Sequence, residues 1–126
     1  MEEKKPHILI VEDSENILTV IKLMFELQGW NVSERTNLTT IIDDVKQIKP
    51  DLILMDMLLS GANGCDACKM IKQDNEIKKI PLIIMSAHPK AHQEANDAGA
   101  NYFIAKPFEM DQIIGKVQQA LDEHPK

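Results

Sequence analysis

The segment Asp51-Leu-Ile-Leu-Met-Asp56 decides the fold of this chain. Its run of apolar residues, 52–55, is typical of a strand that is covered on both faces, as strands inside a parallel sheet are. An acid closes the run, and a carboxylate at the end of a buried strand is costly unless water, a cation or a reaction uses it. The segment therefore predicts a central parallel strand that carries a functional acid, Asp56, at its end.

Similar apolar runs recur on both sides of this segment and alternate with stretches of helical periodicity. Strands are predicted over His7–Val11, Trp30–Glu34, Asp51–Asp56, Pro81–Ser86 and Tyr102–Ala105. Helices are predicted over Asn16–Gln28, Leu38–Ile48, a stretch after Gly64 that ends near Asp74, Lys90–Ala98 and Met110–Asp122. The turn residues of Ser60–Gly64 predict a loop.

This alternation predicts an α/β fold of the (βα)5 type, in which helices cover both faces of one parallel sheet. Right-handed crossovers restrict the topology, and the most polar strand, Trp30–Glu34, suits an edge. We therefore expect a flavodoxin-like doubly wound sheet with strand order 2-1-3-4-5. Ligands of such sheets bind at the carboxyl ends of the strands, where the first and third strands diverge.

Size and composition predict a single domain, residues 1–126 with a core of about 5–122, of an ordinary globular protein with 44% apolar and 27% charged residues. The net charge of −6 argues against direct nucleic-acid binding, which needs clustered basic residues. No apolar run has the length of a membrane span, and the start has no signal-peptide pattern. With two cysteines and no export signal, we expect a cytoplasmic location.

Charged residues follow three of the predicted strands: Glu12 and Asp13, Asp56, and Lys106. Parallel strand ends meet at one edge, where two carboxylates 4 Å apart would repel by about 4 kcal/mol at an effective dielectric near 20. A divalent cation removes that repulsion, and oxygen-only ligands in an open pocket favour Mg²⁺, which pairs with phosphate. Lys106 and the Ser86 hydroxyl then suit phosphoryl oxygens, and Asp56 is the candidate nucleophile for an aspartyl phosphate.

Over about residues 5–121 the chain resembles the CheY-like receiver domain of two-component response regulators. Five matching pieces occur in the family's order at the predicted strand ends: Ile8-Leu-Ile-Val-Glu-Asp13, Pro50-Asp-Leu-Ile-Leu-Met-Asp-Met57, Ile83-Ile-Met-Ser-Ala87, Gly99-Ala-Asn-Tyr-Phe103 and Lys106-Pro-Phe108. Each piece is weak evidence alone, but the set in this order is specific. Ser60 departs from the pattern, because the family usually has proline there, and this predicts a looser loop after Asp56.

The resemblance implies a role for each matching residue. Asp56 would accept a phosphoryl group from a phosphohistidine, and Ser86, Lys106 and the backbone amides of Met57 and Ala87 would bind the phosphoryl oxygens. Mg²⁺ would be held by Glu12, Asp13, Asp56 and the backbone carbonyl of Leu58. Phe103 would be the switch aromatic, and the Lys106–Pro107 bond would be cis, which an X–Pro bond permits at low cost.

The resemblance also implies a signalling switch that catalyses only its own phosphorylation and dephosphorylation. Phosphorylation adds a charge of about −1.5 to −2. Ser86 would move toward that charge, Phe103 would turn into the vacated space, and the surface formed by segments 90–98, 102–105 and 110–122 would change. We expect a histidine kinase or histidine phosphotransfer protein as donor, a downstream protein target, and a monomer or a phosphorylation-dependent dimer.

Other functions remain open at this point. The chain could be a receiver from a hybrid kinase or a longer regulator. A haloacid-dehalogenase-type phosphatase also uses an aspartyl nucleophile, but it needs a second acid where Leu58 stands. A flavin-binding module shares the fold class, although the acid cluster would repel a phosphate.

Two further features have competing interpretations. Cys65-Asp-Ala-Cys68 at a helix start could be a redox pair with a lowered thiolate pKa, or two buried core thiols. The apolar residues of the first helix cover an arc of about 220°, more than contact with a sheet needs. We assign the surplus to Leu18, Leu23 and Leu27, either as extra packing or as a docking face for a helical partner. The histidines at 7, 92 and 124 are expected at the surface or at strand edges.

Overall fold

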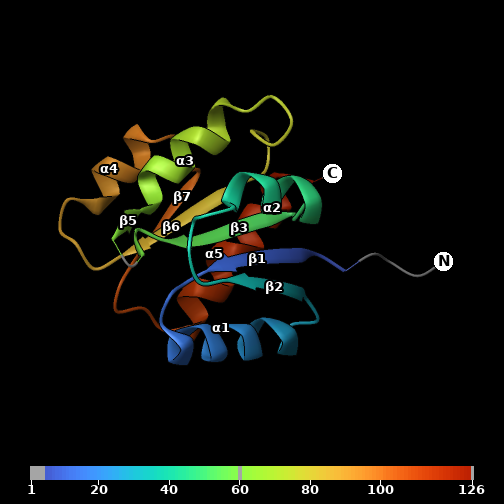
Figure 1. Cartoon of the computed structure of the whole chain (residues 1–126). Helices are drawn as coiled ribbons and strands as arrows, with labels where there is room; N and C mark the ends of the chain where they lie inside the picture. Colours follow the sequence, from blue (N-terminus) through green and yellow to red (C-terminus); the bar gives the residue numbers. More distant parts are fainter. Residues whose placement is uncertain (1–4, 60, 126) are drawn as a thin grey trace.

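A five-stranded parallel sheet forms the centre of the computed structural model, which describes residues 5–59 and 61–125. The strands are β1 (His7–Val11), β2 (Asn31–Arg35), β3 (Leu52–Asp56), β6 (Leu82–Ser86) and β7 (Tyr102–Ala105). They lie in the order β2-β1-β3-β6-β7, and every neighbouring pair is parallel (Figure 1). The predicted doubly wound sheet, with order 2-1-3-4-5 in strand succession, is confirmed.

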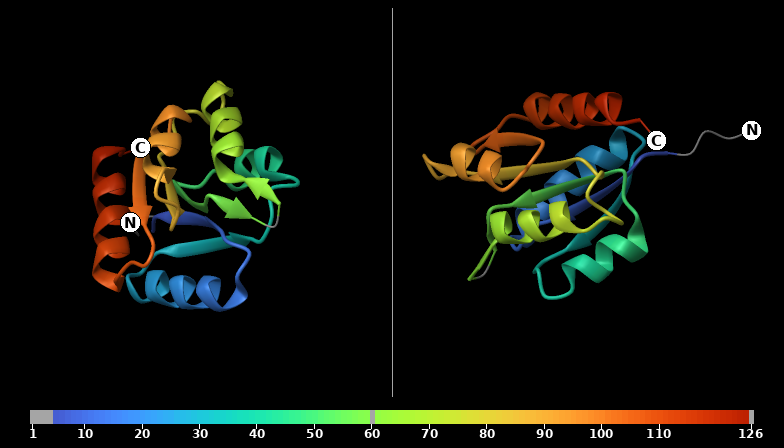
Figure 2. Two further views of the ribbon diagram at one scale, coloured as in Figure 1. Left: turned by 90° about the vertical axis from the view of Figure 1, so that its left-hand side faces the viewer. Right: turned by 90° about the horizontal axis from the view of Figure 1, so that it is seen from above.

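Helices cover both faces of the sheet, as Figure 2 shows. They are α1 (Glu15–Leu27), α2 (Ile41–Ile48), α3 (Gly64–Gln73), α4 (Ala91–Asp97) and α5 (Met110–Glu123). The side chains of α1 and α5 share one apolar core, and those of α2, α3 and α4 share the other. None of the helices in the described part of the chain is long and apolar enough to cross a membrane.

The central strands contribute side chains to both cores, because successive side chains of a strand point to opposite faces of the sheet. Ile8 and Ile10 of β1 pack on the α1–α5 side, whereas Leu9 and Val11 pack on the other side, and all four side chains are fully buried. Burial of an aliphatic side chain of this size contributes about 1.5–3 kcal/mol. The edge strand β2 has no fully buried residue, which agrees with its polar sequence.

Helix α2 begins three residues later than the periodicity of Leu38–Ile48 predicts. Leu38 packs against the core from the turn that precedes the helix, so it fits the apolar pattern without being helical. The helix ends where Lys49 adopts a left-handed conformation, with φ of 50°, just before Pro50. A residue that precedes proline is disfavoured in the α region, which explains this end.

The predicted loop after Asp56 contains a small hairpin. Leu58–Leu59 (β4) pairs antiparallel with Ala62–Asn63 (β5), and Gly61 turns the chain with a positive φ of 87°. Helix α3 follows directly, and the Asn63 side chain caps it by accepting a hydrogen bond from the Cys65 amide at 2.7 Å. Ser60, for which a looser loop was predicted, lies outside the described residues.

Candidate functional site

The carboxyl ends of β1, β3, β6 and β7 lie at one edge of the sheet. Asp56 is the last residue of β3 and is in register with Met85, which precedes Ser86 at the end of β6. Ser86 in turn pairs with Ala105, so Lys106 follows at the same level. The parallel ladder thus brings residues that lie up to 94 positions apart in the sequence to one edge of the sheet.

Two buried acids and one lysine meet at this edge. The Lys106 ammonium donates a hydrogen bond to the Asp56 carboxylate and lies 3.4 Å from Glu12 Oε2. Glu12 is 1% exposed and Asp56 is 7% exposed. The predicted convergence of Glu12, Asp56 and Lys106 is therefore present in the structure.

The charge balance of this cluster is negative. Burial and a hydrogen bond with Asp56 raise the pKa of Glu12 to about 7. The Ser14 amide, which donates to Glu12 Oε1 at 3.2 Å, has the smaller opposite effect of lowering this pKa. Burial lowers the pKa of Lys106, but the hydrogen bond and charge of Asp56, together with Glu12, outweigh burial and raise it overall. The Lys106 ammonium thus lies between the carboxylates of Glu12 and Asp56, and their negative charge would stabilise a further cation here.

The donor atoms at this edge fit magnesium in type. Within residues 5–59 and 61–125 no group of three or more His, Cys, Asp or Glu side chains is arranged to hold a metal ion. Mg²⁺ does not need such a group, because it is usually bound through one or two carboxylates and keeps several waters. Asp13 is half-buried directly after Glu12, and the backbone of Leu58 lies against the Asp56 carboxylate. Both positions supply oxygen atoms, the ligand type that Mg²⁺ prefers.

Two backbone amides next to Asp56 have partners in the structure. The Met57 amide donates to the Met85 carbonyl at 2.9 Å, so it belongs to the sheet in this structure. The Leu58 amide, which the sequence analysis did not select, donates to Asp56 Oδ1 at 3.1 Å. An Asp side chain commonly bonds the amide two residues later, and this local rule could have identified Leu58.

Ser86 and Ala87 complete the wall of the site at the end of β6. Ser86 is 3% exposed, and its Oγ accepts a hydrogen bond from the His88 amide at 3.0 Å. The hydroxyl can still donate, because a serine oxygen has one proton and two lone pairs. Ala87 is exposed beside it.

Phe103 is half-buried between the site and the surface. Its ring stacks on that of His92 in α4, with centroids 4.9 Å apart and an angle of 9° between the ring planes. His92 was expected at the surface, and it is exposed, but its stacking on Phe103 could not be read from the sequence. The Lys106–Pro107 bond after β7 is cis, as predicted.

Comparison with known proteins decides the family. The family model described as response regulator receiver domain matches residues 8–118. The chain belongs to this family. Receiver domains are the CheY-like signalling switches of two-component systems, and the flavodoxin-like fold agrees with that assignment.

The relatives of this receiver domain include both regulators and kinases. The uncharacterized transcriptional regulatory protein YkoG of Bacillus subtilis is 30% identical over 123 residues, which are 96% of this chain and 53% of that protein. A solved receiver domain of a signal transduction histidine kinase from Syntrophus aciditrophicus is 26% identical, with a TM-score of 0.88 over 96% of this chain and 93% of that one. The receiver domain thus spans about half the length of the curated relatives it matches.

A third relative bears on the metal. The receiver domain of a sensor histidine kinase from Pseudomonas aeruginosa was solved with a magnesium ion coordinated in its active-site cleft. It is 26% identical to this receiver domain, with a TM-score of 0.86 over 94% of this chain and 99% of that one.

The two cysteines of this receiver domain are core residues. Both are buried and free, and Cys68 Sγ donates to the Ala98 carbonyl at 3.5 Å. Burial raises the pKa of Cys68 to about 11 and also raises that of Cys65. The shift is opposite to the lowered pKa that a redox pair needs, so the alternative of buried thiols is supported.

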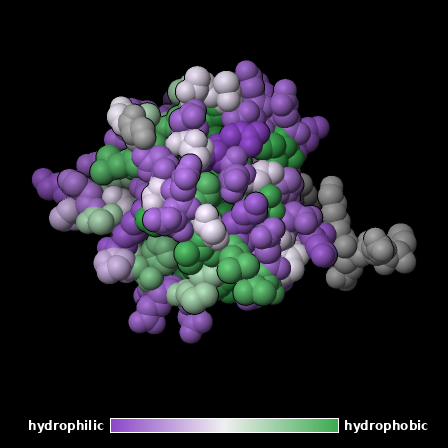
Figure 3. All heavy atoms as spheres, turned by 60° about the horizontal axis from the view of Figure 1, so that its bottom comes forward, coloured by the Kyte–Doolittle hydropathy of each residue, from purple (hydrophilic) through white to green (hydrophobic). Residues whose placement is uncertain are grey.

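Helix α1 of the receiver domain exposes a different apolar stripe from the predicted one. Leu18 is 5% exposed and packs in the core, which supports extra packing for this residue and excludes it from a docking face. Val20, Leu23 and Leu27 are 56%, 58% and 75% exposed, and their i, i+3, i+7 spacing places them on one side of the helix. Figure 3 brings this side of the molecule forward and shows hydrophobic side chains bordered by hydrophilic ones.

Proposed function

We propose that this receiver domain accepts a phosphoryl group on Asp56 from a phosphohistidine of a histidine kinase or histidine phosphotransfer protein, in a magnesium-dependent reaction. The observation that carries the proposal is the Asp56 carboxylate, which is 7% exposed at the end of β3 and hydrogen-bonded by the Lys106 ammonium. An acid in this position suits a nucleophile better than a structural cap, because ligands of such sheets bind at this edge.

The transfer makes one bond and breaks one. An Asp56 oxygen bonds to phosphorus while the bond from phosphorus to the donor imidazole nitrogen breaks, which leaves the phosphoryl group on Asp56 and frees the histidine. The protein then acts mainly by positioning and by stabilising charge. Lys106 and the Ser86 hydroxyl lie where they could bind phosphoryl oxygens, and the Leu58 amide is a further donor at Asp56.

We also assign the backbone amides of Ala87 and Met57 to the phosphoryl oxygens, because the family motif implies this role for them. The Met57 amide must first release the Met85 carbonyl, to which it is bonded in this structure.

Glu12, Asp13, Asp56 and the Leu58 carbonyl would hold the magnesium ion. When bound, the ion neutralises charge on the carboxylates and on the incoming phosphoryl group. Support comes from the oxygen-only donors and from the burial of Glu12 beside Asp56, which together raise the pKa of Glu12.

Phosphorylation would be read out on the surface formed by α4, β7 and α5. The phosphoryl oxygens would compete for Lys106 and draw the Ser86 hydroxyl toward them. Phe103 would then turn inward, and α4, whose His92 stacks on Phe103, would shift with it. We propose that a downstream protein binds this changed surface, and that the domain remains a monomer or dimerises on phosphorylation. The acidic net charge of −6 supports a protein target rather than direct binding of nucleic acid by this domain.

The experiment is treatment with acetyl phosphate and Mg²⁺ followed by intact mass measurement. We expect the wild-type chain to gain one phosphoryl group, and we expect no gain for Asp56→Asn or in EDTA. Asp97→Asn is a matched control, because Asp97 is an exposed acid on α4 outside the site. A gain that survives in Asp56→Asn, or no gain in the wild type, would overturn the proposal.

A further inference from the structure

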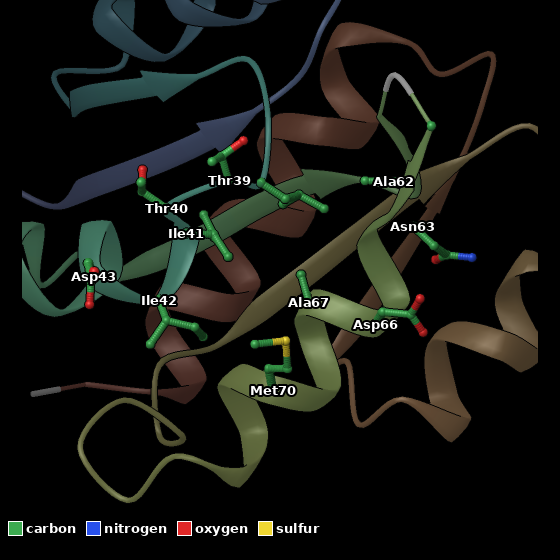
Figure 4. A pocket seen from close by; sticks show the side chains of 12 residues that line it. Thr39, Thr40, Ile41, Ile42, Asp43, Ala62, Asn63, Asp66, Ala67 and Met70 are labelled. Atoms are coloured by element: carbon green, nitrogen blue, oxygen red, sulfur yellow. The ribbon is translucent and has the colours of Figure 1, made fainter.

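A hollow lies apart from the acid cluster, between α2 and α3. It has a volume of about 540 Å³ and is lined by the first turn of α2, the turn before it, strand β5 and the first half of α3 (Figure 4). None of the roles proposed for Asp56 and its neighbours uses it. We call it the α2–α3 pocket.

The walls of the α2–α3 pocket carry apolar side chains, and Thr39, Thr40 and Asn63 contribute polar ones. Ile42 and Leu38 are partly buried against the core, and Met70 of α3 is 56% exposed. Figure 4 shows Ile42, Ala67 and Met70 facing the space between the two helices. A partly apolar hollow of this size on a folded domain suits a side chain of a ligand or partner.

The rim of the α2–α3 pocket is acidic. Asp43 of α2 and Asp66 of α3 stand at opposite sides of the apolar side chains in Figure 4, and none of the described residues that line the pocket is basic. Neither acid forms a salt bridge with another described residue. The starts of the two helices together contribute about +1 of partial charge, less than the −2 of the acids. The pocket therefore favours a cation next to an apolar group.

Two of the cations near the pocket are engaged in ion pairs. Arg35 of β2 pairs with Asp44 at 3.2 Å, and Lys46 of α2 pairs with Asp74 at 3.1 Å. Asp43 and Asp66 form no ion pair with a described residue, although Lys46 lies near Asp43 and Lys69 follows Asp66 by about one turn of α3.

The wall of the α2–α3 pocket is also continuous with the backbone of Asp56. Asn63 lines the pocket and pairs with Leu58 across the β4–β5 hairpin. The next amide, that of Gly64, donates to the Met57 carbonyl at 2.6 Å. A methyl group placed on Gly64 would lie 2.5 Å from the Asp56 carbonyl oxygen, so α3 starts in direct contact with the acid's backbone.

We propose that the α2–α3 pocket is a docking site for a partner protein that presents an apolar side chain next to a lysine or arginine. Because the pocket shares the hairpin with Asp56, its occupant binds with an affinity that depends on phosphorylation. This dependence rests on the proposed function of Asp56. Charge complementarity selects the basic segment, and the apolar walls select the neighbouring side chain.

The test is a titration of the ¹⁵N-labelled full chain with acetyl-Leu-Arg-amide at millimolar concentration, followed by amide chemical shifts. We expect the largest shifts at Asn63, Ala67 and Met70, and weaker binding of acetyl-Leu-Glu-amide. The double variant Asp43→Asn/Asp66→Asn should raise the dissociation constant of the Leu-Arg probe by about two- to tenfold, as exposed ion pairs do. The control Asp97→Asn, outside the pocket, should leave it unchanged.

Each other outcome has a definite meaning. The docking site is overturned by any of three results. These are an absence of chemical-shift changes around the pocket, equal affinity for the Leu-Glu probe, and an unchanged dissociation constant of the Leu-Arg probe in the double variant. The same titration on chain phosphorylated by acetyl phosphate, with phosphorylation verified by intact mass, tests the coupling: a dissociation constant that changes at least twofold supports it, and an unchanged one overturns it. A chain that gains no phosphoryl group contradicts the proposed function, while binding to the unmodified chain still supports the pocket.

Discussion

At the scale of single residues, Lys106 balances the charge of the site. Its ammonium bridges Asp56 and Glu12, and all three groups are largely shielded from water. Sequence alone could predict this triad, because each member ends or follows an apolar run and parallel strand ends must meet. The Leu58 amide and the His92–Phe103 stack were missed, because both depend on local side-chain conformations.

Replacing Lys106 should therefore destabilise the protein. Lys106→Met leaves two buried carboxylates without their cation, and we expect the free energy of unfolding in EDTA to fall by about 1–3 kcal/mol, less than for a fully buried pair. Urea denaturation measures this loss. Lys79→Met, at an exposed position, should change stability by less than about 0.5 kcal/mol, and equal effects of the two variants would contradict the prediction.

Cys68 should make stability fall at alkaline pH. Burial raises the pKa of this thiol from 9.0 to about 11, so the folded state keeps a proton that the unfolded state loses. The stabilisation is complete below pH 9 and is lost as the pH rises through 11. We expect Cys68→Ala to show a shallower loss of unfolding free energy than the wild type over that interval in urea denaturation at several pH values. Parallel curves would refute the assignment.

At the scale of elements, the hairpin and the start of α3 connect the site to the rest of the fold. The sequence predicted strand and helix positions well where apolar periodicity was unbroken, as in β1, β3 and β6. It misplaced the start of α2, because Leu38 is apolar and packs on the core from outside the helix. The β4–β5 pair was missed because turn residues alone do not distinguish a loop from a two-residue ladder.

Gly64 should be intolerant of a side chain. Gly64→Ala would press a methyl group against the Asp56 carbonyl oxygen, and we expect a loss of about 1–3 kcal/mol together with slower phosphorylation by acetyl phosphate. Gly115→Ala is the matched control, because nothing lies within 4 Å of the added methyl group in α5, and it should stabilise the protein by about 0.5–1 kcal/mol. Thermal unfolding and phosphorylation kinetics distinguish the two, and a Gly64→Ala protein equal to wild type in both would contradict the close packing.

The exposed stripe of α1 should serve the phosphoryl donor. The double variant Leu23→Lys/Leu27→Lys is expected to slow phosphotransfer from a cognate kinase or phosphotransfer protein at least tenfold, because the docked donor loses apolar contact. A tenfold change in rate corresponds to about 1.4 kcal/mol of activation free energy. Phosphorylation by acetyl phosphate, which needs no docking, should stay unchanged. Equal transfer rates from the protein donor, with the fold intact by circular dichroism, would exclude this helix as the docking face.

At the scale of the whole molecule, the fold could be predicted because the alternation of strands and helices, the right-handed crossover and the polar edge strand allow few arrangements. The topology placed Glu12, Asp56 and Lys106 at one edge of the sheet, whereas the way in which Asp13 and the Leu58 carbonyl would face an ion depends on loop conformation. The two helix layers leave the strand ends open at one edge, which is where a cation would enter.

Magnesium should therefore stabilise the whole chain. At tenfold excess over its dissociation constant the ion is expected to raise the free energy of unfolding by about 1.4 kcal/mol. Asp13→Asn should reduce this gain, whereas the exposed control Asp97→Asn should keep it, as thermal unfolding with and without Mg²⁺ will show. An undiminished gain in Asp13→Asn would remove Asp13 from the ligand set.

The borders of the sheet have a consequence for behaviour in concentrated solution. Strand β2 forms one border, and its last two residues, Glu34 and Arg35, are held by Lys22 and Asp44. Strand β7 forms the other border and is four residues long. Charged or short borders resist the addition of a strand from another molecule. We therefore expect little edge-to-edge association between copies of this domain in concentrated solution.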